Sequence, residues 1–270
     1  MPLSMLSQDG LGEVPSPEPH KYLAYMSRWL SIPASSLPQG FDEAWKARIW
    51  DRWSMENHPK LKPWLAQQRL LTIRALSCMH EDLCVFEPAC GTGRVTWDLL
   101  SIPNVKTVVA WDINRTAVAT TRERLSTHPR FRDLRLSENN IRALPEIVHR
   151  YWTPGSVLPV VVCLEVFFHL PGLEELINDM ATRLPSGTVV VGNLKSREGL
   201  FMNRALNRGL GAALELCVLM AASLLLRRSY RLPEIGAHTA VQASRLLSPF
   251  VDPQIVSNDL YHWFTATVRH

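Results

Sequence analysis

The sequence of 270 residues lacks most features that mark secreted, metal-binding or nucleic-acid-binding proteins. Its five cysteines include no Cys-x-x-Cys pair, so we expect neither a disulfide framework nor a zinc or other metal site. The net charge is only +4, which does not provide the concentrated basic surface of a nucleic-acid-binding protein. We therefore expect buried, reduced thiols and no nucleic-acid partner.

Neither a signal-like start nor a long uninterrupted apolar run is present. Residues 1–19 are rich in Pro and Ser and lack a basic start followed by an apolar run, which predicts a loose tail and a cytoplasmic location. The most apolar stretch, residues 210–226, is interrupted by Glu215 and is shorter than the roughly 20 residues of a membrane-spanning helix. With 46% hydrophobic residues, the chain has enough apolar side chains for a sizeable core and no transmembrane span is expected.

The most informative stretch that is present is Leu-Cys-Val-Phe-Glu-Pro-Ala-Cys-Gly-Thr-Gly, residues 83–93. A short apolar run predicts a buried strand that ends at Glu87, and Gly91 and Gly93 then lead into a helix-like segment at 94–100. A buried carboxylate needs a polar partner, and glycines let a ligand approach the backbone. A helix N-terminus offers free N–H groups. Together these features predict a nucleotide-like ligand at the carboxyl edge of a parallel sheet.

Two other nucleotide motifs fit this stretch less well. No Gly-Lys-Ser/Thr follows, which argues against a P-loop. The dinucleotide fingerprint requires a third glycine where Thr96 stands.

A second acid follows about twenty residues later, which is the spacing at which a carboxylate on the neighbouring strand can accept both hydroxyls of a ribose. This acid is Asp112, at the end of a strand-like run at 106–111. The alternative is that Asp112 caps the helix that starts at Asn114.

The order of these motifs resembles that of class I S-adenosylmethionine-dependent methyltransferases, whose first motif is acid-x-Gly-x-Gly-x-Gly; here Ala89 replaces the first glycine. The resemblance covers roughly residues 80–198 and 246–270. It implies an α/β fold with a doubly wound, seven-stranded, mostly parallel sheet that ends in an antiparallel hairpin, and S-adenosylmethionine as the cofactor. The residues implied to contact that cofactor are Glu87, Ala89, Gly91, Gly93, Asp112, Ile113, Asn140 and Cys163.

Within this resemblance, Ile113 is expected against the adenine ring, and Asn140 stands where the family commonly has an Asp that accepts from the adenine amino group. Asn139 is the alternative, and an ordinary turn remains a second explanation of both. The strand predicted at 160–163 leads into the family's fourth motif. There Glu165 and His169 are candidate general bases, although in many relatives the histidine instead caps the following helix. His238 is a further candidate.

Four parts are expected along the chain: a tail at 1–19, a helical cap at 20–80, the sheet domain at 81–198 and 246–270, and a helical lid at 199–245. In the cap, a helix is predicted over 63–79 with an apolar face. Its aromatic residues either wall the substrate, touching the sulfonium by cation–π contact, or fasten the cap to the core. These residues are Tyr22, Tyr25, Trp50 and Trp53.

The resemblance implies an enzyme that methylates O, N or C of a small, hydrophobic or aromatic metabolite. The alternatives are a methyltransferase acting on RNA or protein, and a non-catalytic binding module. The segment 210–226 fits a helix over the active site, a homodimer contact or a peripheral membrane contact aided by the arginines that follow it.

Overall fold

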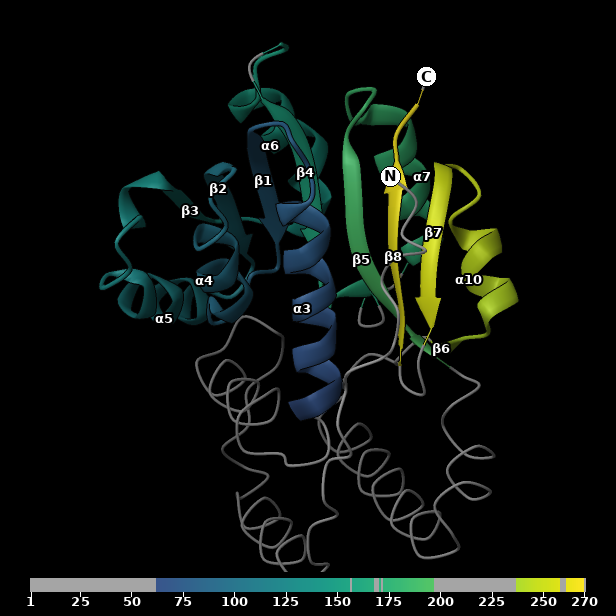
Figure 1. Ribbon diagram of the computed structural model, residues 1–270, viewed down its shortest axis with the longest axis horizontal. Coiled ribbons are helices and arrows are strands. Elements are labelled where there is room, and N and C mark those ends of the chain that lie inside the picture. The colour runs from purple at the N-terminus through teal and green to yellow at the C-terminus, as the bar shows by residue number, and fades with distance from the viewer. Residues whose placement is uncertain are drawn as a thin grey trace, which may run out of the picture.

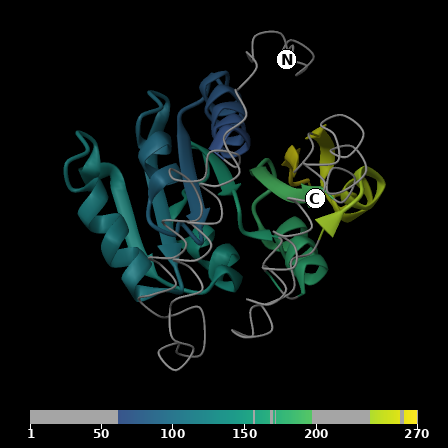
Figure 2. The same ribbon diagram turned by 90° about the horizontal axis from the view of Figure 1, so that it is seen from below.

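The computed structural model describes residues 62–155, 157–167, 170, 172–196, 237–257 and 261–269. These residues form one eight-stranded sheet with helices on both of its faces (Figures 1 and 2). Several candidates from the sequence lie outside the described residues, as does the segment 210–226; they are Tyr22, Tyr25, Trp50, Trp53 and His169.

The sheet has the order β3-β2-β1-β4-β5-β8-β7, and the short strand β6 pairs with β5. Its strands are β1 (Leu83–Pro88), β2 (Val105–Asp112), β3 (Leu134–Glu138), β4 (Leu158–Cys163), β5 (Val189–Ser196), β6 (Ala237–His238), β7 (Val251–Ser257) and β8 (Tyr261–Thr267). All pairs are parallel except those that β8 makes with β5 and β7. The expected seven-stranded, mostly parallel sheet with a terminal hairpin is therefore confirmed, and β6 adds a two-residue strand to it.

Helices connect the strands and cover the two faces. They are α3 (Lys62–Ser77), α4 (Arg94–Leu100), α5 (Arg115–Leu125), α6 (Leu144–Tyr151), α7 (Leu173–Arg183) and α10 (Ala240–Leu246), with single 3-10 turns η4 (Phe131–Asp133) and η5 (Ile141–Ala143). One buried cluster joins α3, α4 and α5 to the sheet, and the other joins α6, α7 and α10 to the opposite face. Alternate strand residues enter alternate clusters, as the strand period of two requires.

Helix α3 buries a face that coincides only in part with its apolar pattern: Leu76 is fully buried and Ile73 packs against the core. The sequence favours a buried stripe through Leu65, Leu70, Ile73 and Leu76, but Leu70 is 38% exposed. The buried stripe is Gln68, Thr72 and Leu76, spaced four residues apart. Two of these three side chains are polar because they bond to polar groups of the sheet, as described below.

The strand order reverses between β1 and β4, because the chain runs outward from β1 to β2 and β3 and then crosses back to β4 and β5. Open α/β sheets bind ligands at such a switch point, outside the carboxyl ends of the strands. In Figure 1 the arrow of β8 points upward and β5 runs antiparallel to it, so the carboxyl ends of the parallel strands lie at the lower edge.

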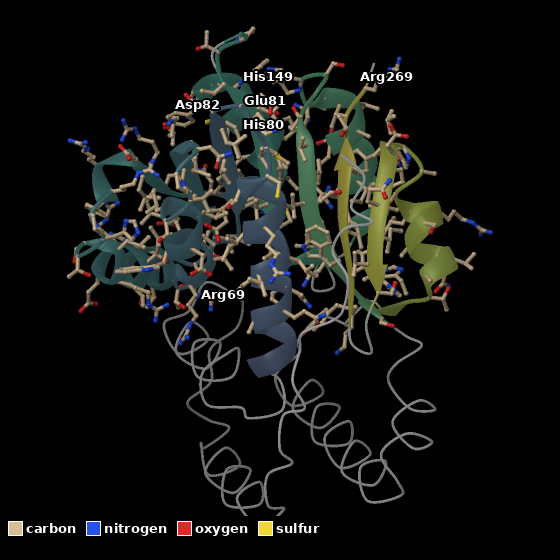
Figure 3. All side chains as sticks on the ribbon, viewed as in Figure 1. Arg69, His80, Glu81, Asp82, His149 and Arg269 are labelled. Carbon is tan, nitrogen blue, oxygen red and sulfur yellow. The ribbon has the colours of Figure 1, made fainter. Side chains whose placement is uncertain are left out.

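A hollow of about 320 Å³ opens at the other edge, between Asp82, Trp152 and Gly187. Figure 3 labels Asp82 at this upper end, with His80, Glu81 and His149. Since Asp82 precedes β1, the hollow lies at the amino end of the strands and is separate from the switch point. Within the described residues, no helix combines the length and the apolar character that crossing a bilayer requires.

Residues 237–245, which the sequence assigns to the lid, form β6 and most of α10. They pack on the sheet: β6 pairs with the end of β5, and Ala243 enters the core beside α7. The other residues of the expected lid, 199–236, lie outside the described residues.

Candidate active site

The two acids expected to bind a ligand lie on one face at one edge of the sheet. Val85 and Ala110 enter the buried cluster beneath α3, α4 and α5. Glu87 and Asp112 follow each of them by two residues, so they lie on that same face at the carboxyl ends of β1 and β2. The strands are neighbours, and Glu87 is in register with Ala110. The two carboxylates are therefore close enough, and on the same side of the sheet, for one ligand to contact both.

Glu87 is a buried acid with an unmet requirement for a partner. Its side chain is only 4% exposed, and the Oε2 atom has no hydrogen-bond partner among the described residues. The pKa of Glu87 is raised to about 8, mainly by burial; the Thr96 hydroxyl opposes the rise, and the nearby carboxylates of Asp98 and Asp112 add to it. A positively charged or hydrogen-bond-donating ligand group would supply the missing partner.

Asp112 fastens the glycine turn (residues 89–93) to the end of β2. Its Oδ2 accepts from the backbone N–H of Gly91 at 2.9 Å, and its Oδ1 accepts from that of Asn114 at 2.8 Å. The side chain of Asn114, not that of Asp112, caps α5, accepting from Thr116 and Ala117. Burial raises the pKa of Asp112, and these backbone hydrogen bonds oppose that rise. Each carboxylate oxygen retains a second lone pair for a ligand hydroxyl.

The glycine turn adopts left-handed backbone conformations at three positions, Ala89 (φ 54°), Gly91 (φ 57°) and Gly93 (φ 79°). The hydroxyl of Thr121 donates to the Gly91 carbonyl at 2.8 Å. A Cβ atom placed on Gly93 would lie 2.7 Å from Cγ2 of Thr121. The turn is therefore pressed closely against α5, and only glycine fits at position 93.

The segment that contains Asn139 and Asn140 lies beside the end of β2. The backbone N–H of Asn139 donates to the Asp112 carbonyl at 3.1 Å, and the indole of Trp111 donates to the Asn140 carbonyl at 3.1 Å. The Asn140 side chain is exposed, and its oxygen accepts from the backbone of Arg142, as a turn residue does. Ile113 is 48% exposed at the same edge, which leaves an apolar surface open.

Cys163, at the end of β4, is fully buried, and its side chain belongs to the cluster on the α6 and α7 face. Burial raises the pKa of its thiol well above the usual range. Any contact between Cys163 and a ligand at this edge would therefore involve its backbone.

Glu165 follows β4 and is bonded from two other strands. Its backbone N–H donates to Oδ1 of Asn193 at 2.8 Å, and Nδ2 of Asn193 donates to its Oε1 at 2.8 Å. The hydroxyl of Tyr261 donates to Oε2 at 3.1 Å. Nδ2 of Asn193 also donates to Gln68 of α3. We call these four residues the Glu165 network.

Sequence reasoning identified Glu165 but missed the other members of the network. Asn193 is a polar residue inside the apolar strand β5, and Gln68 is a polar residue at a helix position that faces the sheet. Both are almost completely buried, and a buried polar side chain requires a partner. A search for polar residues inside apolar segments would have found Asn193.

His238 lies at the other side of this edge, in β6. Its side chain is half-buried and its Nε2 has no hydrogen-bond partner among the described residues; burial lowers its pKa. Its carbonyl is 3.0 Å from Nε2 of the buried His262, whose Nδ1 is 2.8 Å from the hydroxyl of Ser257. In the described part of the chain, no group of three or more His, Cys, Asp or Glu residues suits a metal ion.

Comparison with known proteins yields no match to a protein-family model and none to a curated protein. Solved structures do match. An O-methyltransferase family protein from Burkholderia thailandensis is 13% identical with a TM-score of 0.52, over 93% of this chain and 70% of that one. The N-methyltransferase NodS from Bradyrhizobium japonicum, in complex with S-adenosylhomocysteine, is 14% identical with a TM-score of 0.51, over 85% and 100%.

A third match is magnesium protoporphyrin IX methyltransferase from Synechocystis, also with bound S-adenosylhomocysteine. It is 14% identical, with a TM-score of 0.51, over 84% of this chain and 96% of that one. Identities this low establish the fold and leave the activity open. The chain has the fold of the class I S-adenosylmethionine-dependent methyltransferases.

Proposed function

We propose that this protein is an S-adenosylmethionine-dependent methyltransferase that acts on a small, hydrophobic or aromatic metabolite. The observation that carries the proposal is Glu87, a buried carboxylate without a partner on one of its oxygens, at the switch point of a methyltransferase fold. A ligand with an ammonium group would satisfy it. The matching structures include an O-methyltransferase family protein and an N-methyltransferase, so they support methyl transfer without selecting the accepting atom.

The residues at the carboxyl edge fit the parts of this cofactor. Glu87 would pair with the ammonium of the methionine part, and Asp112 would accept from the ribose hydroxyls. The open backbone of Gly91 and Gly93 would allow close approach, and Ile113 would cover the adenine ring. Asn140 would accept from the adenine amino group with the second lone pair of its side-chain oxygen. When bound, the cofactor supplies a methyl group activated by a positive sulfur.

The protein itself would contribute alignment and exclusion of water, because the methyl donor is already activated. An apolar substrate is supported by the apolar segment 210–226 of the sequence and by the concentration of aromatic residues in the expected cap. Tyr22, Tyr25, Trp50 and Trp53 remain candidates for the substrate wall, and His169 remains a candidate base; all five are proposals from the sequence.

Calorimetric titration with S-adenosylhomocysteine tests the proposal. Wild-type protein should bind, and Glu87→Gln should weaken binding by about 1.5–3 kcal/mol because a charged hydrogen bond is lost. Glu123→Gln, an exposed change on α5, is the matched control and should leave the affinity unchanged. Absence of binding to the wild-type protein would favour a scaffold with no catalytic role.

A second measurement separates small-molecule from macromolecular acceptors. Labelled S-adenosylmethionine is incubated with the protein and either a metabolite extract or a macromolecular fraction. Label should enter the metabolite fraction and resist nuclease and protease treatment. Label confined to RNA or protein would contradict the proposed substrate class.

A further inference from the structure

We propose that Glu165 is the general base of the reaction and that the accepting atom of the substrate is a hydroxyl oxygen or an amine nitrogen that carries a proton. This inference rests on the proposed function and deepens it, because it selects the chemical class of the acceptor. It is carried by the geometry of the Glu165 network at the edge where the parallel strands end.

The backbone at Glu165 is strained in a way that places its carboxylate. Its φ of 62° lies in the left-handed region, which costs a residue with a side chain roughly 1–2 kcal/mol. Along β4, Val162 and Leu164 enter the cluster beneath α3 and α4, whereas Cys163 enters the opposite one. Simple alternation would send Glu165 to the side of Cys163. The left-handed conformation instead brings its carboxylate to the α3 side, against Asn193 and Tyr261.

One side chain maintains this strained conformation. Asn193 is completely buried, and its amide bonds both the backbone N–H and the carboxylate of Glu165. The orientation of the amide is unambiguous, because a backbone N–H needs the oxygen and a carboxylate needs the nitrogen. The second N–H of the amide bonds Gln68, so every hydrogen-bonding group of Asn193 is used. Strain that is maintained by a dedicated partner is typical of functional sites.

Glu165 is the most exposed residue of an otherwise buried network. Glu165 is half-buried, whereas Gln68, Asn193 and Tyr261 are each at most 8% exposed. Each carboxylate oxygen accepts one hydrogen bond from the network and retains a lone pair for a proton. The network therefore orients the carboxylate without occupying all of its acceptor sites.

The groups around Glu165 set its affinity for protons. Burial raises the pKa of Glu165, the hydrogen bonds from Asn193 and Tyr261 and the positive charge of Lys195 on β5 lower it, and the resulting pKa is about 7. Burial and the Glu165 carboxylate raise the pKa of Tyr261 well above its usual value, so Tyr261 stays a donor. A pKa near the working pH suits a general base.

The step conserves charge and electrons. The O–H bond of a hydroxyl or an N–H bond of a protonated amine breaks, its electron pair stays on the oxygen or nitrogen, and the proton binds a carboxylate oxygen of Glu165. The heteroatom becomes a stronger nucleophile, and Glu165 becomes a neutral acid that returns the proton to water.

The first test follows the carboxylate without any ligand, by carbon-13 NMR of labelled glutamate side chains from about pH 3 to about pH 9. Besides the carboxyl of Glu87, whose pKa is about 8, one carboxyl should titrate near pH 7, disappear in Glu165→Gln and persist in Glu123→Gln. In Tyr261→Phe its midpoint should rise, because a hydrogen bond to the charged form is lost. A Glu165 carboxyl that titrates near the ordinary glutamate pKa of 4.5 would overturn the proposal, as would a midpoint that Tyr261→Phe leaves unchanged.

The second test measures methyl transfer to the metabolite extract together with binding of S-adenosylhomocysteine. Glu165→Gln should lower the transfer rate by about 100-fold or more and abolish its rise through pH 7, with the dissociation constant unchanged. Full transfer by Glu165→Gln would overturn this inference alone. Failure of the wild-type protein to bind S-adenosylhomocysteine would overturn the proposed function and, with it, this inference.

Discussion

At the scale of single residues, ionisation of Glu87 lowers the stability of the unliganded protein and favours binding of a ligand that carries an ammonium group. Its folded-state pKa of about 8 exceeds the ordinary value of 4.5, so the native protein binds this proton more tightly than the unfolded chain does. The resulting stability is fully present below pH 4.5 and is lost as the pH rises through 8. A ligand ammonium that pairs with the ionised form would offset this loss.

Replacement of Glu87 by Gln should therefore stabilise the unliganded protein at high pH. We expect Glu87→Gln to match the wild type near pH 5 and to exceed it by a few kcal/mol near pH 9, since Gln needs no ionisation. Urea unfolding at both pH values measures this difference. A difference of equal size at the two pH values, or the same pH dependence in Glu123→Gln, would contradict a raised pKa at Glu87.

Ala89 is a second residue whose backbone conformation has a measurable cost. An alanine in the left-handed region loses roughly 1–2 kcal/mol, while glycine adds about 0.5–1 kcal/mol of unfolded-state entropy. Ala89→Gly should therefore raise the free energy of unfolding by up to about 1 kcal/mol, as measured by denaturant titration. If Ala89→Gly instead lowers the free energy of unfolding by about 0.5–1 kcal/mol, as Ala→Gly does in a regular helix, the left-handed conformation at position 89 costs little.

At the scale of secondary-structure elements, α3 is held to the sheet by polar contacts one helical turn apart. The indole of Trp263 in β8 donates to the hydroxyl of Thr72 at 3.0 Å, and Gln68 bonds Asn193 in β5. The apolar pattern of the helix predicted Leu76 and Ile73 on the buried side and missed Gln68 and Thr72, because only these partners make the burial of polar residues favourable. Helix α3 is thereby fixed in register against the carboxyl half of the sheet.

The contact at Thr72 can be tested with a change of nearly constant shape. Thr72→Val leaves the Trp263 indole N–H buried without a partner, so we expect a loss of about 1–3 kcal/mol of stability. Thr182→Val on α7 is the control, because that exposed hydroxyl bonds only within its own helix. Thermal unfolding of both variants makes the comparison, and equal losses would show that the buried hydrogen bond contributes little.

The packing of the glycine turn against α5 can be separated from its backbone conformation. Gly93 and Gly155 have nearly the same φ, 79° and 80°, but only Gly93 would bring a Cβ against another residue. Both alanine variants should lose roughly 1–2 kcal/mol from backbone strain. Gly93→Ala should lose about 1–3 kcal/mol more by overpacking.

Chemical denaturation measures both glycine variants. Thr121→Ser in the Gly93→Ala background should recover part of the difference, because it removes the clashing Cγ2 atom and keeps the hydroxyl that donates to the Gly91 carbonyl. Equal losses in Gly93→Ala and Gly155→Ala would indicate that the turn moves away from α5 at little cost.

At the scale of the whole molecule, the sheet order brings the ends of β1, β2, β4 and β5 to one edge. Ligand binding at this edge is therefore coupled to the protonation of Glu87. Affinity for S-adenosylhomocysteine should increase as the pH rises toward 8, approaching tenfold per pH unit, because binding favours ionised Glu87. At a ligand concentration of about 100 times the dissociation constant, the stability gain is about 2.7 kcal/mol. Calorimetry at pH 6 and pH 8 tests the pH dependence, which Glu87→Gln should abolish.

Much of the fold follows from local patterns. The helix predicted over 94–100 coincides with α4, and the strands predicted at 83–86, 106–111 and 160–163 lie within β1, β2 and β4. These elements were predictable because apolar runs bounded by glycines and acids report local conformation. The alternative that Asp112 caps α5 is wrong, because the side chain of Asn114 caps that helix; both residue types suit a cap, and only the coordinates show which side chain reaches the helix N–H groups.

The sequence by itself determined a parallel α/β sheet, the acids at its strand ends and the glycines between them, because each depends on residues close together in the chain. Only the tertiary structure decided the surroundings of Glu165, since Gln68 and Asn193 are 125 positions apart and no local pattern connects them. The same applies to the buried face of α3, whose polar stripe is stable only against the partners that the sheet provides. Local patterning fixes which elements form, and the pairing of buried polar groups fixes how they fit together.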